Sequence, residues 1–327
     1  MRASSARLKS PFVVCLWLVD QCNLACRYCY AMPFRGAAMP RDRMLSLLDE
    51  LVDQEVFDVT LAGGEPFLHP HVLDAIDCLL CGRVNVGVLS NGTLLGPELA
   101  ARLVDRVAGR EGFLLQISLD GLTPAVHDRT RGCGELVLRN LQGLCEQTDL
   151  RLQIATVLNA HNIGTAHELI DRYYPRVKRY HFMNLQRTEA SLHHDDLFVS
   201  EERNRRFWEE LEGHMRTLPA DILVTGLAIM RLAHRMQADP QRHRLNSTFY
   251  CEGCTAGVTH VEITATFDVL GCDIAKDFTH MGNVAGCRFE EVWHSPKAEE
   301  VRRQPVPACY LVRDPEGHTL AETSGRA

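Results

Sequence analysis

The sequence lacks the features that would place the protein in a membrane, on nucleic acid or outside the cell. Its longest apolar run, Phe12 to Val19, is far shorter than the roughly 20 residues that cross a bilayer. Lysine and arginine number 35 against 42 aspartates and glutamates, and the net charge of -7 predicts no binding to nucleic acid or to an anionic membrane. Basic residues precede that apolar run, as in a signal peptide, but no small-x-small cleavage site follows. We expect a cytoplasmic protein.

Disulfide pairing does not explain the cysteine content. Thirteen cysteines are an odd number, and they are too sparse in 327 residues for the scaffold of a small secreted domain. They are also too many for ordinary core filling, although Cys15, Cys78, Cys81 and Cys145 lie in apolar patterns and are expected to be small core residues. The remaining cysteines indicate metal ligation in a reducing compartment.

The chain from residue 13 to about 185 alternates short apolar runs with amphipathic helical stretches, which is typical of an α/β fold. Ligands of such folds gather at the C-terminal ends of the strands, whether the sheet closes or stays open. The alternation predicts six parallel strands, at Val13–Val19, Val56–Ala62, Val84–Leu89, Phe113–Leu119, Leu152–Leu158 and Arg179–Leu185.

The composition changes after that region and predicts four parts. Residues 11–190 form the α/β domain, and residues 191–250 form a helical bridge with helices at Phe207–Met215 and Leu227–Met236. Residues 251–312 form a small cysteine-rich module that contains the strand-like run Val258–Thr264, and residues 313–327 form a flexible tail.

A triad of cysteines follows the first predicted strand directly. Cys22, Cys26 and Cys29 have the spacing CxxxCxxC, so their thiolates can converge on one iron–sulfur cube and leave its fourth iron without a protein ligand. A structural zinc site would need a fourth ligand, and the nearest further candidates, His69 and Cys78, lie about forty residues later.

This triad, with four further motifs in order after later strands, resembles the radical S-adenosylmethionine (SAM) superfamily. The resemblance implies a partial (β/α)6 barrel of the TIM type, a [4Fe-4S] cluster at the triad, and SAM bound to the open iron by its amino and carboxylate groups. Reductive cleavage of SAM would then give a 5′-deoxyadenosyl radical that removes hydrogen from the substrate.

The motifs also suggest individual SAM contacts. Two glycines allow close approach of the backbone in GGEP, and the following carboxylate can accept from an ammonium group. Ser118 and Asp120 are two residues apart, so they can share a strand face, although Asp120 could equally cap the next segment. By resemblance, the contacts are Tyr28 near the adenine, Gly63, Gly64, Glu65 and Pro66 at the amine, Asn91 after the third strand, Ser118 and Asp120 at the ribose, Arg131 at the carboxylate, and Val157 beside the adenine.

A second set of cysteines lies near the C-terminus. Together with the runs Gly282–Val284 and Phe289–Trp293 it resembles the SPASM extension or the shorter twitch extension, which implies one auxiliary [4Fe-4S] cluster. A zinc-ribbon-like site remains the alternative. The expected ligands are Cys254, Cys272 and Cys309, with Cys251, Cys287 or the substrate as the fourth, and a spare thiol at Cys251 or Cys287 could return a hydrogen atom during catalysis.

The resemblance implies a peptide maturase that crosslinks, oxidises or epimerises a ribosomal precursor peptide, with a flavodoxin- or ferredoxin-type electron donor. The alternative is a dehydrogenase, epimerase or decarboxylase acting on a sugar, aminocyclitol or nucleoside in antibiotic biosynthesis. That alternative is favoured by the dozen residues before the first strand, which leave no room for a leader-recognition domain. A non-catalytic iron–sulfur or zinc protein is a third hypothesis, but it leaves the recurring glycines and turn residues at the strand ends unexplained.

Overall fold

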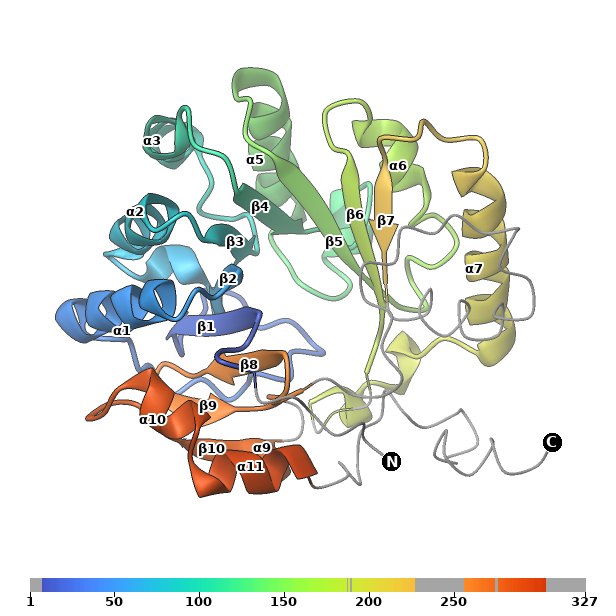
Figure 1. Ribbon diagram of the computed structural model, residues 1–327. Coiled ribbons are helices and arrows are strands. Elements are labelled where there is room, and N and C mark those ends of the chain that lie inside the picture. The colour runs from blue at the N-terminus through green and yellow to red at the C-terminus, as the bar shows by residue number, and fades with distance from the viewer. Residues whose placement is uncertain (1–7, 187, 189, 227–255, 274–275, 304–327) are drawn as a thin grey trace.

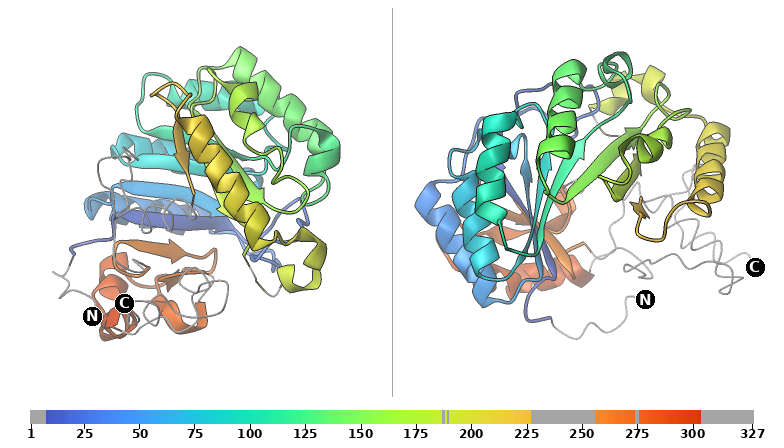
Figure 2. Two further views of the ribbon diagram at one scale, coloured as in Figure 1. Left: turned by 90° about the vertical axis from the view of Figure 1, so that its right-hand side faces the viewer. Right: turned by 90° about the horizontal axis from the view of Figure 1, so that it is seen from above.

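The structure is a computed structural model, and it describes residues 8–186, 188, 190–226, 256–273 and 276–303. Its centre is one curved sheet with helices outside the curve (Figures 1 and 2). Seven strands run parallel to their neighbours: β1 (Val13–Val19), β2 (Asp58–Gly63), β3 (Asn85–Ser90), β4 (Phe113–Ser118), β5 (Leu152–Leu158), β6 (Arg179–Asn184) and β7 (Leu223–Thr225).

The C-terminal residues continue this sheet. β8 (His260–Ile263) pairs in parallel with β1, and β9 (Asp268–Leu270) and β10 (His280–Asn283) add antiparallel strands beyond it. The strand order is β10-β9-β8-β1-β2-β3-β4-β5-β6-β7, and the sheet does not close between its two edges. The expected partial barrel is therefore confirmed.

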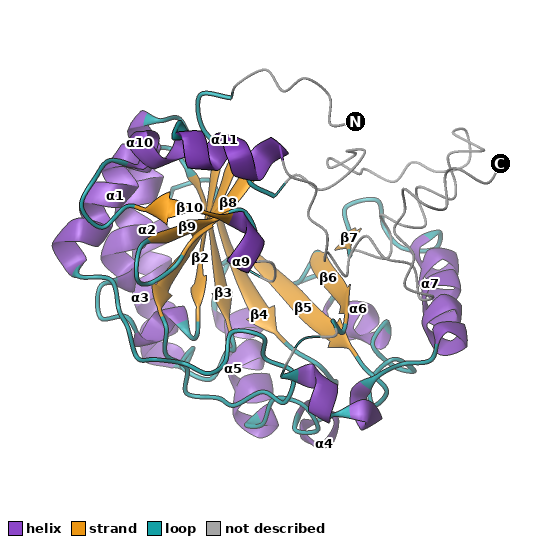
Figure 3. Cartoon of the chain, turned by 90° about the horizontal axis from the view of Figure 1, so that it is seen from below, coloured by secondary structure: helices purple, strands orange, loops and turns teal. Residues whose placement is uncertain are grey.

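The long helices that connect the parallel strands lie on the convex side of the sheet, as the view from below shows for α1, α2, α3 and α5 (Figure 3). The longer ones are α1 (Arg41–Asp53), α2 (Val72–Cys81), α3 (Pro97–Val107), α5 (Gly134–Gln147), α7 (Glu201–Met215) and α11 (Pro296–Arg303). The shorter ones are α4 (Pro124–His127), α6 (Glu168–Tyr173), α9 (Lys276–Thr279), α10 (Phe289–Trp293), and the 3-10 turns η1 (Pro66–Leu68), η2 (Ser191–His193) and η3 (Asp195–Leu197).

Buried and less buried side chains alternate along the strands, because one face of the sheet packs against the helices and the other faces inward. In β1, Val14, Leu16 and Leu18 are fully buried in the core shared with the helices. Cys15 and Trp17 therefore point to the other, inner face, because successive side chains of a strand alternate. The helices meet the core with matching spacing, as Met44, Leu47, Leu48 and Leu51 do in α1.

All six predicted strands are present, with ends that differ by two residues at most. The expected helix at Phe207–Met215 is the second half of α7, and the one at Leu227–Met236 lies outside the described residues. The prediction that Cys81 is a core residue was wrong, because Cys81 ends α2 on its exposed side, whereas Cys78 and Cys145 pack against the core. No helix among the described residues is long and apolar enough to span a bilayer.

Candidate functional site

The three cysteines of the CxxxCxxC motif lie in one loop at the carboxyl end of β1. The loop is tied to its surroundings by main-chain hydrogen bonds, from Asp20 N to Ala37 O at 2.7 Å and from Arg27 N to Thr130 O at 2.9 Å. Cys22, Cys26 and Cys29 are all half-buried.

Burial raises the pKa of Cys26 to about 11, and the neighbouring Cys29 and Cys22 raise it further while Arg131 lowers it. The pKa of Cys22 and that of Cys29 are also raised, chiefly by burial. The three thiols therefore stay protonated at neutral pH until a metal displaces their protons.

The number and spacing of these thiols along the chain match the ligands of an iron–sulfur cluster. Within the described residues, no three side chains of histidine, cysteine, aspartate or glutamate converge closely enough to hold one metal ion. In a cubane cluster each cysteine binds a different iron, so the ligand sulfurs stand farther apart than around one zinc ion. Three half-buried thiols on one loop offer such a cluster three ligands.

Gly63 and Gly64 bring the end of β2 against the cysteine loop. Gly64 N donates to Val19 O at 3.0 Å, and a Cβ at Gly64 would lie 1.9 Å from Gln21 O and 2.9 Å from Cys22 N. A Cβ at Gly63, where φ is +116°, would lie 2.2 Å from Val19 O. Only glycine permits this contact between two main chains, so the pair fixes where the loop begins.

Glu65 joins the ends of β2 and β3. Its buried carboxylate accepts from Phe67 N at 3.2 Å, from Ser90 Oγ at 3.0 Å and from Asn91 N at 2.7 Å, while Pro66 begins η1 beside it. Burial raises the pKa of Glu65 to about 7, against the lowering effect of these donors. Oε1 thus accepts from two protein donors and Oε2 from one. The contact of Glu65 with the amine of SAM stays a prediction.

Asp120 has a comparable position after β4. Its fully buried carboxylate accepts from the Tyr28 hydroxyl, from Thr130 Oγ1 at 2.8 Å, from Arg131 Nε at 3.0 Å and from Val157 N at 3.0 Å. Both oxygens therefore have protein donors, unlike a carboxylate free to hold a ribose. Asp120 links the cysteine loop, through Tyr28, to β5.

Ser118 and Arg131 keep hydrogen-bonding capacity that the protein does not use. Ser118 is the last residue of β4. Its hydroxyl has no hydrogen-bond partner in the described part of the chain. Arg131 is about one-tenth exposed, lies over the Tyr28 ring at 5.3 Å and uses only Nε on Asp120, so its terminal nitrogens can bind a carboxylate. Asp120 also raises the pKa of Arg131, so the guanidinium stays charged.

Two contacts near the loop were not expected from the sequence. Arg27, between two of the cysteines, forms an ion pair with Asp196 at 2.8 Å, which brings η3 against the loop. His127 accepts from Asp120 N at 3.2 Å through Nδ1, so its buried Nε2 carries the hydrogen and has no partner within the described residues. Burial lowers the pKa of His127 to about 4. The ion pair of Arg27 with Asp196 joins residues 169 positions apart and leaves no local sequence signal.

Of the C-terminal ligand candidates, Cys251, Cys254 and Cys309 lie outside the described residues. Cys272 follows β9, and the next residue, Asp273, donates its main-chain N–H to Glu262 at 3.4 Å and hydrogen-bonds Tyr30, which directly follows Cys29, so Cys272 lies on the side of the inner face. Cys287 lies on the outer side, where its carbonyl accepts from Arg43 of α1 at 2.9 Å, and this position gives no support to a catalytic thiol.

The inner face of the sheet between the cysteine loop and Cys272 carries polar side chains. Glu262 of β8 pairs in register with Cys15 of β1 and is 7% exposed. Its carboxylate accepts from Trp17 Nε1 at 3.2 Å, which is a contact between side chains far apart in the sequence. The substrate of a site at the cysteine loop would meet this face.

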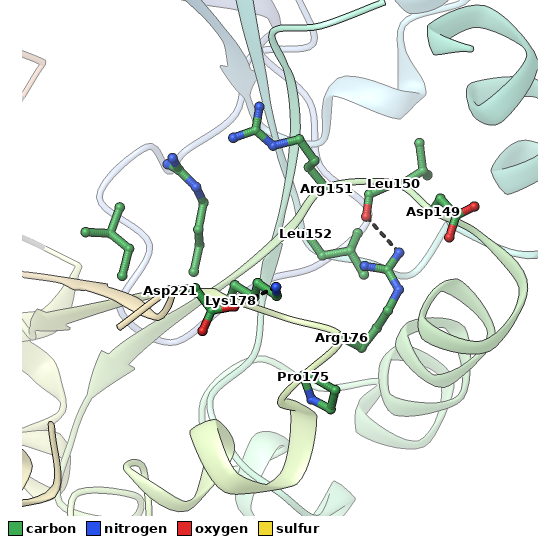
Figure 4. Close-up of a pocket in the computed structure, with 10 residues that line it drawn as sticks. Asp149, Leu150, Arg151, Leu152, Pro175, Arg176, Lys178 and Asp221 are labelled. Atoms are coloured by element: carbon green, nitrogen blue, oxygen red, sulfur yellow. Dashed lines mark hydrogen bonds and ion pairs between the residues drawn. The ribbon is translucent and has the colours of Figure 1, made fainter. Parts of the chain in front are cut away.

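A groove of about 460 Å³ lies at the amino ends of β5, β6 and β7, where Leu152, Arg179 and Leu223 begin those strands. Figure 4 shows Arg176 reaching the main chain at Leu150, a hydrogen bond of 2.7 Å. Parallel α/β folds bind ligands at the carboxyl ends of their strands. We therefore place the candidate site at the cysteine loop.

Two family models match the chain. Residues 18–172 match the radical SAM superfamily, and residues 254–311 match an iron–sulfur cluster-binding domain of the SPASM type. The first match contains the cysteine loop and every predicted SAM contact, and the second contains Cys254, Cys272, Cys287 and Cys309.

Curated relatives include mycofactocin maturases MftC. The one from Mycobacterium ulcerans is 32% identical over 51% of this chain, but this match spans 46% of the relative's length. The one from Mycolicibacterium smegmatis is 28% identical over 92% of this chain and 75% of the relative. Among solved structures, Streptococcus suis SuiB bound to precursor peptide SuiA has a TM-score of 0.73 at 16% identity, over 90% of this chain and 67% of that one. That likeness is one of fold.

Proposed function

This chain belongs to the radical SAM superfamily, and from that premise we propose that it cleaves SAM reductively and modifies a ribosomally made precursor peptide. The observation that carries the proposal is the loop of three half-buried thiols at the carboxyl end of β1, held against Gly63 and Gly64. Membership implies a [4Fe-4S] cluster and SAM as cofactors, and the SPASM domain implies auxiliary cluster binding.

When bound, the cluster and SAM would supply one electron and a carbon radical that no protein side chain can supply. Cys22, Cys26 and Cys29 would hold the cluster, and the terminal nitrogens of Arg131 would bind the carboxylate of SAM. Asp120 keeps the Arg131 guanidinium charged and oriented through the bond to Nε. Ser118 offers a free hydroxyl to the ribose.

The substrate assignment rests on the inner face and on the relatives. The face between the cysteine loop and Cys272 carries Glu262, which accepts from Trp17 Nε1 and has lone pairs left that can accept from peptide N–H groups. Relatives named maturases, and the SuiB structure with a precursor peptide, favour a peptide over a small molecule. We place the reaction in the cytoplasm with a flavodoxin- or ferredoxin-type donor, because thiolate ligation requires a reducing compartment.

The first experiment is an anaerobic assay for 5′-deoxyadenosine from SAM with a chemical reductant. We expect product from the wild type and none from Cys26→Ala, because that variant lacks one cluster ligand. Cys81→Ala is the matched control, since Cys81 is an exposed cysteine at the end of α2 and should leave the product yield unchanged. Equal product from wild type and Cys26→Ala would contradict the proposal.

The second experiment identifies the substrate class. A candidate precursor peptide, taken from a short reading frame beside the gene, is incubated with enzyme, SAM and reductant and analysed by mass spectrometry. The proposal expects a mass loss from a crosslink or oxidation, or incorporation of solvent deuterium on epimerisation. Modification of a sugar, aminocyclitol or nucleoside, with every peptide unchanged, would show the small-molecule alternative to be right.

A further inference from the structure

The sulfur of Cys22 accepts hydrogen bonds from its own loop and from a side chain of another loop. The main-chain N–H of Leu24 lies 3.4 Å from Cys22 Sγ, and Nδ2 of Asn91 lies 3.7 Å from the same sulfur. The Leu24 donor belongs to the cysteine loop itself. Asn91 comes from the turn after β3, so it is an independent element brought to the sulfur by the fold.

The direction of the Asn91 amide follows from its other contacts. Its Oδ1 accepts from the main-chain N–H of Thr93 at 2.9 Å, and a main-chain N–H can only donate. The oxygen must therefore face Thr93, which leaves the NH2 group on the side of Cys22. One of its hydrogens goes to Asn23 Oδ1 at 2.8 Å, and the second is directed at the sulfur.

Neighbouring side chains hold this amide in place. Thr93 Oγ1 donates to Asn91 Oδ1 at 2.6 Å and accepts from Asn23 Nδ2 at 2.8 Å, which closes a ring of polar contacts between the two loops. The main chain of Asn91 is fixed by its N–H on Glu65 at 2.7 Å. Asn91 is 8% exposed, so water does not compete freely for these bonds.

We propose that Asn91 is a positioning residue that sets the reduction potential of the cluster bound through Cys22, by donating an N–H to Cys22 Sγ. This inference rests on the proposed function. It gives Asn91 a contact with a cluster ligand, and the direct contact of Asn91 with SAM stays a prediction.

The expected sign follows from charge. When the cluster takes one electron from a flavodoxin- or ferredoxin-type donor, part of the added negative charge falls on the cysteine sulfurs. An N–H donor therefore stabilises the reduced form more than the oxidised form, which raises the reduction potential. Removing the donor should make the cluster harder to reduce, while the Leu24 donor stays in place.

The experiment is a potentiometric titration of the full-length protein with reconstituted clusters, monitored by electron paramagnetic resonance. The signal that changes on addition of SAM identifies the cluster at the triad and separates it from any auxiliary cluster. Two variants are compared with wild type. Asn91→Ala removes the N–H, and Asn91→Asp keeps the shape and the acceptor for Thr93 but places an oxygen near the sulfur.

Asn140→Ala is the matched control. Asn140 Nδ2 donates to Gly92 O at 2.9 Å and Thr93 O at 3.0 Å, so it holds the same turn without touching the sulfur. We expect Asn91→Ala to shift the equilibrium toward the oxidised cluster about tenfold, which is about 59 mV for one electron. Asn91→Asp should shift it at least as far, and Asn140→Ala should leave it near the wild-type value.

Several results would overturn the inference. One is an unchanged potential in both Asn91 variants, and another is an equal shift in Asn140→Ala, which would indicate disorder of the turn. Loss of iron from both Asn91 variants, with normal iron content in Asn140→Ala, would mean that Asn91 is needed for assembly of the site. Failure of the proposed function is distinguishable from all of these, because wild-type protein would then show no SAM-responsive cluster.

Discussion

The contact between Gly64 and the cysteine loop can be tested by adding a single methyl group. In Gly64→Ala the new Cβ would stand 1.9 Å from Gln21 O, whereas ordinary contacts begin at 3.4 Å. The loop would therefore have to recede by about 1.5 Å, and it cannot do so by a side-chain rotation because both obstructing atoms are main chain. Overpacking of this kind costs about 1–3 kcal/mol of folding free energy.

The effect on activity should exceed the effect on stability. A displacement of about 1 Å in reacting groups can lower a rate about 100-fold, and the displaced residue here adjoins Cys22. We expect Gly64→Ala to lose most of its bound iron and 5′-deoxyadenosine formation while it still folds. Gly143→Ala is the control, because Gly143 lies within α5 and a Cβ there would meet nothing within 4 Å outside its own helix, so alanine should be neutral or stabilising. Wild-type iron content and product yield in Gly64→Ala would refute the reasoning.

Two further predictions concern the charged groups beneath the site. The pKa of Glu65 in the folded protein is about 7, above its ordinary value of 4.5. Its contribution to the free energy of unfolding is therefore fully present below about pH 4.5, and it declines by up to about 3 kcal/mol as the pH rises through 7. Urea unfolding of cluster-free protein should show this decline, and Glu65→Gln should reduce it; identical pH profiles would contradict the account. Arg131→Lys should weaken SAM binding about tenfold in equilibrium dialysis because the planar fork is lost, whereas the exposed Arg129→Lys should not. Equal effects of the two substitutions would argue against a role for Arg131.

The barrel could be predicted from the sequence because its strands are local apolar runs between amphipathic helices. Each run of six or seven residues carries enough apolar side chains to identify it, as Val14, Leu16 and Leu18 do in β1. β7 was missed because Leu223–Thr225 is only three residues long. The pairing of β8 with β1 joins residues about 245 positions apart, and no local pattern records such a contact.

The site was predictable in its location but not in its internal contacts. Glu65, Asp120 and Arg131 lie at one edge of the sheet, as we expected from their residue types and their positions after strands. The sequence could not show which N–H and O–H groups of the protein hydrogen-bond the carboxylates of Glu65 and Asp120. Glu65 accepts from three and Asp120 from four protein N–H and O–H groups, so both organise the loops around the site, while Arg131 and Ser118 keep capacity for a ligand.

The central claim is that Cys22, Cys26 and Cys29 hold an iron cube, and metal analysis tests it most directly. Wild-type protein and the triple Cys→Ala variant are reconstituted anaerobically side by side, and iron and zinc are counted per chain. The account predicts about four more irons in the wild type than in the variant, with negligible zinc. One zinc per wild-type chain that disappears from the variant, together with equal iron in both, would contradict it.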